Sequence, residues 1–155
     1  MSQKDLILVI IQVALFILFI IIPAGYAPPM IPAFLSFMMT TAGILIASAG
    51  VLTIGKGFTP FPTPKVSGQL KQTGIYKYIR HPMYSGIIIS GLGIAFYNSN
   101  IPRLVVCLIL WIFFEYKSRY EEKLLEQKYP EYSQYKTVTG RFFPSINILK
   151  KNIKS

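Results

Sequence analysis

Residues 6–55 contain no charged side chain, and this run restricts the possible folds more than any other feature of the chain. A water-soluble core does not require such a run, whereas the hydrocarbon interior of a bilayer excludes charge. Its first part, Leu6 to Ile22, is apolar except for Gln12. At about 1.5 Å per residue a helix of this length just crosses a bilayer core. A second apolar segment covers residues 33–54, so the sequence predicts two membrane-spanning helices within residues 1–55.

A secretory signal peptide is the alternative interpretation of the first segment. The apolar run is long for the central region of a signal peptide, and only Lys4 beside Asp5 precedes it. No convincing cleavage site between small residues follows. We therefore expect a retained membrane helix.

A polar connector follows the second segment at residues 55–79. It contains prolines, glycines and lysines but no acid, and the stretch from Gly68 to Lys71 lies near its middle. Two shorter apolar segments come next, at about 83–97 and 104–114, with a turn at residues 98–103 between them. Each would extend only ~17–23 Å as a straight helix, so we expect a short hairpin that barely crosses the membrane or lies partly within it.

Charge is distributed unevenly along the chain. The turn at 23–32 has no lysine or arginine and the turn at 98–103 has only Arg103, whereas the connector and the residues from Glu115 onward are rich in both. The positive-inside rule then places both termini in the cytoplasm, with Lys65 and Lys150 on the same side of the membrane. The predicted fold is an all-α integral membrane protein with about four hydrophobic helices and a cytoplasmic C-terminal helical arm, whose helix ends near Lys128 before Pro130.

The net charge of +10 indicates an anionic partner. The basic residues flank apolar segments and form no soluble basic domain, which favours lipid headgroups over nucleic acid. The single cysteine, Cys107, excludes an intrachain disulfide. With only one histidine in addition, we expect no metal site built from these ligands.

The stretch Lys-Tyr-Ile-Arg-His-Pro-Met-Tyr-Ser-Gly, residues 77–86, joins the connector to the third segment. Proline disfavours the α conformation in the residue before it and suits the first turn of a helix, so Pro82 should begin a helix. Arg80 and His81 then lie at the membrane surface beside a helix N-terminus, where backbone N–H groups favour anions. Arg80 would hold an anionic group there, or else snorkel toward lipid phosphates.

Small residues recur at i, i+4 and i+7 in the third segment, at Gly86, Ser90 and Gly93. Such a stripe usually allows two helices to pack closely. It could also leave room for a flat ligand.

Acids and bases alternate along residues 115–128. On a helix Glu115, Arg119, Glu122 and Glu126 share one face, which is typical of a solvated helix with i,i+4 pairs. A functional interpretation requires this helix to fold back, so that Arg80 and the pair Glu121/Glu122 face a shared pocket. The periodicity leaves both interpretations open.

Three blocks of sequence occur in a characteristic order: GIYKYIRHPMYSG at 74–86, EEKLLEQKYPEYSQY at 121–135 and TGRFFP at 139–144. With these blocks the chain resembles the isoprenylcysteine carboxyl methyltransferase and phospholipid methyltransferase superfamily of integral-membrane enzymes. The resemblance covers roughly residues 65–145, within a catalytic region expected at 56–155.

The resemblance implies S-adenosylmethionine as cofactor, bound between the Arg-His-Pro junction and the double-glutamate helix. It implies that Glu121 contacts the cofactor, that Glu122 lies beside it, and that Lys117 faces the acceptor, with Arg119 as a second candidate for that role. Arg80, Glu121 and Lys117 would then be the catalytic residues. Arg80 is also implied to bind the cofactor, through the cofactor's carboxylate. The other implied cofactor-binding residues are Leu70, Lys71, Tyr76, His81, Pro82 and Tyr84.

The function implied is methyl transfer to a lipophilic acceptor that enters from the bilayer, either a prenylcysteine-like carboxylate or a phospholipid-like headgroup. A carboxylate is already ionised near neutral pH, whereas an amine must lose a proton to His81 or a glutamate. Related NADPH-dependent sterol and steroid reductases are an alternative, although they are usually much longer. A non-enzymatic membrane protein is another.

Overall fold

The computed structural model describes residues 2–25, 27–64 and 68–145, and the regular secondary structure among them is helical, with no strand. This confirms the all-α class. The helices in chain order are α1 (Gln3–Ile21), α2 (Ala33–Ile54), α3 (Pro82–Tyr97), α4 (Ile101–Lys128) and α5 (Tyr132–Val138), with short 3-10 turns η1 (Gly55–Gly57) and η2 (Gly74–Lys77).

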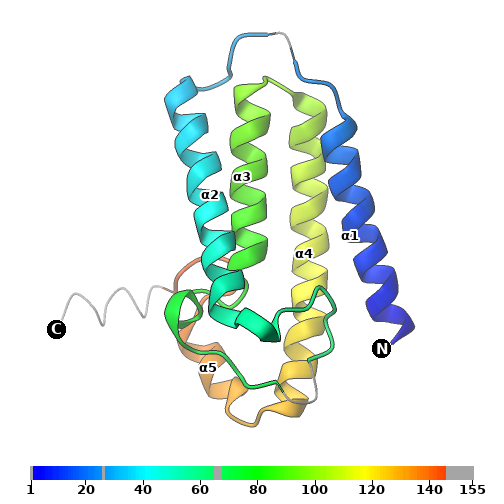
Figure 1. Ribbon diagram of the computed structural model, residues 1–155, viewed down its shortest axis with the longest axis vertical. Helices are drawn as coiled ribbons and strands as arrows, with labels where there is room; N and C mark the ends of the chain where they lie inside the picture. Colours follow the sequence, from blue (N-terminus) through cyan, green and yellow to red (C-terminus); the bar gives the residue numbers. More distant parts are fainter. Residues whose placement is uncertain (1, 26, 65–67, 146–155) are drawn as a thin grey trace, which may run out of the picture.

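The four long helices stand side by side in the spatial order α1, α4, α3, α2 (Figure 1). Consecutive helices α1 and α2 therefore lie at opposite edges of the bundle. A loop from α1 to α2 and a short turn from α3 to α4 lie at its upper end in Figure 1, while the N-terminus, the connector and α5 lie toward the lower end. This arrangement brings the polar parts of the chain together at one end.

Within the part of the chain that the structure describes, two helices are long and apolar enough to cross a membrane: Gln3–Ile21, with a mean hydropathy of 2.6, and Ala33–Gly57, with a mean hydropathy of 1.9. Many of their large apolar side chains point outward, and Ile20, Phe37 and Leu52 are 73%, 72% and 80% exposed. Such a wide apolar surface suits contact with lipid. Two helices of the predicted kind are thus present.

The helix that contains the fourth apolar segment is longer than expected. It runs without a break into the charged arm as the single helix α4 of 28 residues, compared with 19 for α1, 22 for α2 and 16 for α3. The expectation that both helices of the hairpin are short is therefore wrong for its second helix. The reason is local: residues 115–128 are mostly good helix formers, and the first proline after them is Pro130.

The stripe of small residues on α3 packs against α2. A Cβ atom added to Gly86 would lie 2.4 Å from the carbonyl oxygen of Gly43, and one added to Gly93 would lie 2.7 Å from the backbone nitrogen of Thr40. The two backbones touch, so the stripe serves helix packing and leaves no room for a flat ligand.

The last described residues return to the junction before α3. The amide of Arg80 donates to the carbonyl of Gly140 (2.9 Å), the amide of His81 donates to the carbonyl of Arg141 (3.0 Å), and Ile79 and Gly140 form a parallel bridge. A Cβ atom on Gly140 would lie 1.6 Å from the carbonyl oxygen of Phe143, so this position requires glycine. The arm is thus folded back on the Arg-His-Pro junction.

Candidate active site

A cavity of about 480 Å³ lies at the polar end of the bundle, between the connector, the start of α3, the end of α4 and α5. Its volume is within the range of about 300–1,000 Å³ that is common for small-molecule sites. Seven of the residues implied by the resemblance line it: Leu70, Lys71, Tyr76, Arg80, His81, Tyr84 and Glu121. Pro82, Glu122 and Lys117 lie outside the lining.

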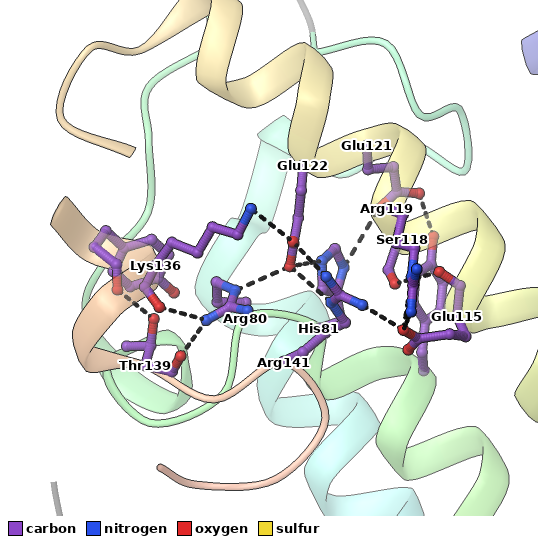
Figure 2. Close-up of polar contacts among 12 residues, drawn as sticks. Arg80, His81, Glu115, Ser118, Arg119, Glu121, Glu122, Lys136, Thr139 and Arg141 are labelled. Carbon is purple, nitrogen blue, oxygen red and sulfur yellow. Dashed lines mark hydrogen bonds and ion pairs between the residues drawn. The ribbon is translucent and has the colours of Figure 1, made fainter. Parts of the chain in front are cut away.

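Arg80 lines the cavity, but its guanidinium is largely engaged within the protein. Nε donates to Glu122 Oε1 (2.9 Å), and Nη1 donates to the carbonyl of Lys136 (3.1 Å) and to that of Thr139 (Figure 2). The side chain is only 8% exposed. The prediction that Arg80 reaches toward lipid phosphates is therefore wrong. Its guanidinium instead holds the C-terminal arm against α4.

His81 lies between the two glutamates of α4 (Figure 2). Nδ1 is 3.4 Å from Glu121 Oε2, and Nε2 is 3.4 Å from Glu122 Oε1. The imidazole ring stacks on Tyr84, with ring centroids 5.5 Å apart. Burial lowers the pKa of His81, but hydrogen bonding and charge from the two glutamates outweigh it and raise the pKa above its ordinary value. The two carboxylates therefore favour the charged form of the imidazole.

Glu121 faces the cavity, and Glu122 faces away from it. The hydroxyl of Tyr84 donates to Glu121 Oε1. Glu122 is 2% exposed and is bound by Arg80 and by Arg141, whose Nε and Nη2 donate to Oε1 (3.1 Å) and Oε2 (2.9 Å). Burial would raise the pKa of Glu122, but hydrogen bonds from His81 and the two arginines hold it well below its ordinary value. Glu122 is thus part of a buried ion cluster.

Arg141 is a residue of this cluster that the sequence reasoning missed. It lies within the block TGRFFP, which carried the resemblance but to which no site residue was assigned. Tyr132 and Tyr135 of α5 also line the cavity, and they lie in the second block. Two of the three blocks therefore contribute more side chains to the site than the sequence alone indicated.

Lys117 is placed differently from the expectation. It is 1% exposed, and its Nζ donates to Gln12 Oε1 (2.5 Å) and to the carbonyl of Pro60 (3.0 Å), so it ties α4 to α1 and to the connector. The alternative, Arg119, is 65% exposed and pairs with Glu115 at 2.8 Å. Neither cation lines the cavity, but Nζ of Lys117 lies 5.6 Å from the ring centroid of Tyr84, so an acceptor-facing role of Lys117 stays a prediction.

Two hydroxyl groups in the cavity wall are buried without a hydrogen-bond partner among the described residues. They belong to Tyr76 and Tyr132. Burial raises the pKa of both phenols, so each remains a neutral donor. An unpaired buried donor costs free energy, which a bound ligand with acceptor atoms would recover. The cavity is therefore suited to a polar ligand.

A second, apolar cavity of about 200 Å³ lies between α3 and α4. Its walls are Tyr84, Ser85, Ile88, Ile89, Leu92, Trp111, Phe114, Phe142 and Phe143. Tyr84 lines both cavities, so they adjoin at this residue. Trp111 and Phe143 are 41% and 54% exposed, which places one side of the apolar cavity at the outer surface of the bundle.

Comparisons with known proteins relate the chain to membrane methyltransferases. The profile of the phospholipid methyltransferase family matches residues 31–132, more than half of the chain. A protein of Oryza sativa subsp. indica named "Probable protein-S-isoprenylcysteine O-methyltransferase" is 32% identical over 109 residues, which are 66% of this chain and 57% of the rice protein. The protein-S-isoprenylcysteine O-methyltransferase of Saccharomyces cerevisiae is 31% identical over 116 residues, 72% of this chain and 48% of the yeast protein.

The chain spans about half the length of the curated relatives that it matches. A solved structure described as the eukaryotic intramembrane Ras methyltransferase ICMT superposes with a TM-score of 0.60 at 19% identity, covering 95% of this chain and 55% of that protein. The superposition shows a shared fold. From the family profile, the relatives and the fold together, the chain belongs to the isoprenylcysteine carboxyl methyltransferase and phospholipid methyltransferase superfamily of membrane proteins.

Proposed function

We propose that this protein transfers a methyl group from S-adenosylmethionine to a lipophilic acceptor at the membrane. The observation that carries the proposal is the pair of adjoining cavities, one polar and about 480 Å³, the other apolar and about 200 Å³. They meet at Tyr84, beside the carboxylate of Glu121. A polar cofactor and an apolar tail would each find a matching wall, with their reacting groups at the junction.

The side chains in the polar cavity fit the groups of S-adenosylmethionine. Cations outnumber acids in the lining, which contains Lys56, Lys71 and Arg80 but only one acid, Glu121, and this excess attracts a carboxylate. The Glu121 carboxylate can accept hydrogen bonds from ribose hydroxyls or compensate positive charge, and the hydroxyls of Tyr76 and Tyr132 can donate. When bound, the cofactor supplies an electrophilic methyl group on a sulfonium.

The protein's own contribution is alignment and exclusion of water. Methyl transfer from a sulfonium requires little covalent help, so holding the acceptor behind the methyl group accounts for most of the catalysis. The rings of Phe114, Trp111 and Phe142 in the apolar cavity can bury a tail of the acceptor.

The charge state of the site favours an acceptor that is already ionised. The glutamates raise the pKa of His81, which favours its protonated form, and Glu121 and Glu122 both accept hydrogen bonds from neighbouring donors, so these three groups are poorly placed to take a proton from an amine. A carboxylate requires no base near neutral pH. Within the proposed function, we therefore infer a carboxylate acceptor in preference to a phospholipid amine.

Equilibrium binding to the purified protein in lipid nanodiscs tests the proposal. S-adenosylmethionine and its demethylated product should both bind, while NADPH should not. Binding of NADPH alone would favour a reductase, and binding of none of the three would indicate a non-enzymatic protein. A prenylcysteine analogue with a free carboxylate should then be methylated, whereas its amide, which keeps the tail, should not be.

A further inference from the structure

Arg141 is linked to His81 in two ways, directly through its backbone and indirectly through Glu122. Its backbone carbonyl accepts a hydrogen bond from the amide of His81 (3.0 Å). Its guanidinium binds both oxygens of Glu122, whose Oε1 lies 3.4 Å from the imidazole Nε2 (Figure 2). One residue of the C-terminal arm thus fixes the main chain of His81 and also the carboxylate beside its ring.

The guanidinium of Arg141 bridges two acids on the same face of α4. Nε and Nη2 hold Glu122 at 3.1 and 2.9 Å, while Nη1 donates to Glu115 Oε1 at 2.5 Å. The forked geometry of arginine permits this bridge, and the single ammonium of lysine cannot reproduce it.

Apart from Arg141, the cationic neighbours of Glu122 hold its carboxylate less firmly. Its other cationic neighbours are Arg80 Nε at 2.9 Å, His81 Nε2 at 3.4 Å and Lys136 Nζ at 3.8 Å. Arg80 contacts one oxygen only, and Lys136 is 39% exposed and also pairs with Glu126 at 2.9 Å. Arg141 is the neighbour that contacts both carboxylate oxygens, so it determines the orientation of the group.

We propose that Arg141 is a positioning residue of the polar cavity: by fixing Glu122, it keeps the His81 ring and the Arg80 guanidinium oriented at the cavity wall. The role in cofactor binding rests on the function proposed above. The effect on His81 does not, because it is a property of the protein without ligand.

The chain contains a single histidine, so its imidazole can be observed directly. NMR of histidine-labelled protein should show the His81 pKa above its ordinary value of 6.5. The groups that contact this ring are Glu121 and Glu122 of α4 and Tyr84 of α3, and the guanidinium groups of Arg80 and Arg141 bind Glu122. In Arg141→Ala, Glu122 should turn away, so that burial dominates and the pKa of His81 falls.

Arg141→Lys should give a smaller fall, and Arg119→Ala provides the matched control. Arg119 also binds Glu115 Oε1, at 2.8 Å, but it is 65% exposed and lies outside the cavity lining, so its loss should leave the His81 signal unchanged. A purely electrostatic role predicts the opposite sign, because removal of a nearby cation raises the pKa of an imidazole. An unchanged or raised pKa in Arg141→Ala would overturn the proposal.

Calorimetric titration with S-adenosylmethionine gives the second readout. Arg141→Ala should weaken binding about tenfold, and Arg141→Lys less, whereas Arg119→Ala should bind like the parent. If Arg141→Ala does not fold, Arg141→Lys decides the matter through the same two measurements. A parent protein that binds no S-adenosylmethionine would contradict the proposed function, and the His81 titration would still decide the role of Arg141.

Discussion

At the scale of single residues, the neighbours Glu121 and Glu122 differ because successive side chains on a helix point about 100° apart. Glu121 faces the cavity and accepts from Tyr84, while Glu122 enters the cluster of Arg80, His81 and Arg141. Sequence alone placed Glu122 beside the cofactor. In the structure, Glu122 instead binds Arg80 and lies beside His81, two residues that line the cavity.

Substitution of three glutamates on α4 should therefore give three different results. Glu121→Gln should weaken binding of S-adenosylmethionine with little loss of stability. Glu122→Gln should cost roughly 3–5 kcal/mol of folding free energy, because it leaves buried arginines uncompensated. Glu126→Gln removes a pair with Lys136 whose side chains are 34% and 39% exposed, and should cost ~0–1 kcal/mol. Binding titrations measure the loss of affinity, and thermal melts measure the loss of stability. Equal, small effects of all three substitutions would contradict the proposed active site.

Removing the hydroxyl groups of two tyrosines in the cavity wall should change the stability of the protein in opposite directions. The hydroxyl of Tyr76 has no partner among the described residues, so Tyr76→Phe should leave the ligand-free protein as stable or slightly more stable while weakening cofactor binding. The hydroxyl of Tyr135 donates to the carbonyl of Tyr76 at 2.5 Å, so Tyr135→Phe should lower stability by ~0.5–1.5 kcal/mol. Thermal melts with and without S-adenosylmethionine distinguish the two. If Tyr76→Phe binds like the parent, its hydroxyl does not contact the ligand.

The ion cluster should also set the pH range of greatest stability. His81 has a raised pKa, so its stabilisation is fully present below its ordinary value of 6.5 and is lost as the pH rises through the raised value. Glu122 has a lowered pKa, so its stabilisation is present above 4.5 and is lost as the pH falls through the lowered value. The melting temperature should be highest between about pH 4.5 and 6.5. In His81→Asn the decline above pH 6.5 should disappear, and its persistence would assign it to another group.

At the scale of helices, the closest contact is the one between α2 and α3. Gly86→Ala would place Cβ against backbone atoms, 2.4 Å from the carbonyl oxygen of Gly43, and should destabilise the protein by ~1–3 kcal/mol. Gly91→Ala on the same helix is the control, because its Cβ meets only side-chain atoms, Cys107 Sγ at 3.1 Å and Phe19 at 3.8 Å. Thermal melts followed by the single tryptophan measure both. Equal stability of the two variants would mean that the helices can separate at little cost.

Helix positions could be predicted from the sequence where local signals are strong. The bounds of α2 agree with the apolar run at 33–54, and α3 begins at Pro82 as the proline rule requires. The continuous α4 was harder to predict because hydrophobicity changes at Glu115 while helix propensity does not. The position of Lys117 was not predictable either, since its partners Gln12 and Pro60 lie in distant segments.

At the scale of the whole molecule, the sequence predicted which residue types form the site but not how they pair. Arg80 was expected to bind a cofactor carboxylate, whereas it is held mainly by Glu122 and by carbonyls of the arm. Such pairs join residues far apart in the chain, and no local pattern encodes them. The helix order brings the connector, the charged half of α4 and α5 to one end of the bundle, so the site lies at that end and not at the centre of the apolar helices (Figure 1).

The helix arrangement makes a testable prediction about orientation in the membrane. Lys65 and Lys150, which the charge pattern assigns to the cytoplasm, lie outside the described residues. The connector with η2, which ends at exposed Lys77, and the charged half of α4, which contains exposed Lys123, lie at the lower end of the bundle in Figure 1, whereas the loop between α1 and α2, which contains Met30 (42% exposed), lies at the upper end.

In a Cys107→Ala background, a membrane-impermeant maleimide should therefore reach Lys77→Cys and Lys123→Cys from the same side of sealed vesicles, and Met30→Cys from the other side. The physical reason is the cost of moving lysine-rich segments across a bilayer, which keeps both basic regions on the cytoplasmic face. Labelling of Lys77→Cys and Met30→Cys from one side would mean that the bundle does not cross the membrane. The polar cavity would then not open to the cytoplasm while the apolar cavity faces lipid, and the proposed meeting of cofactor and acceptor at Tyr84 would lose its basis.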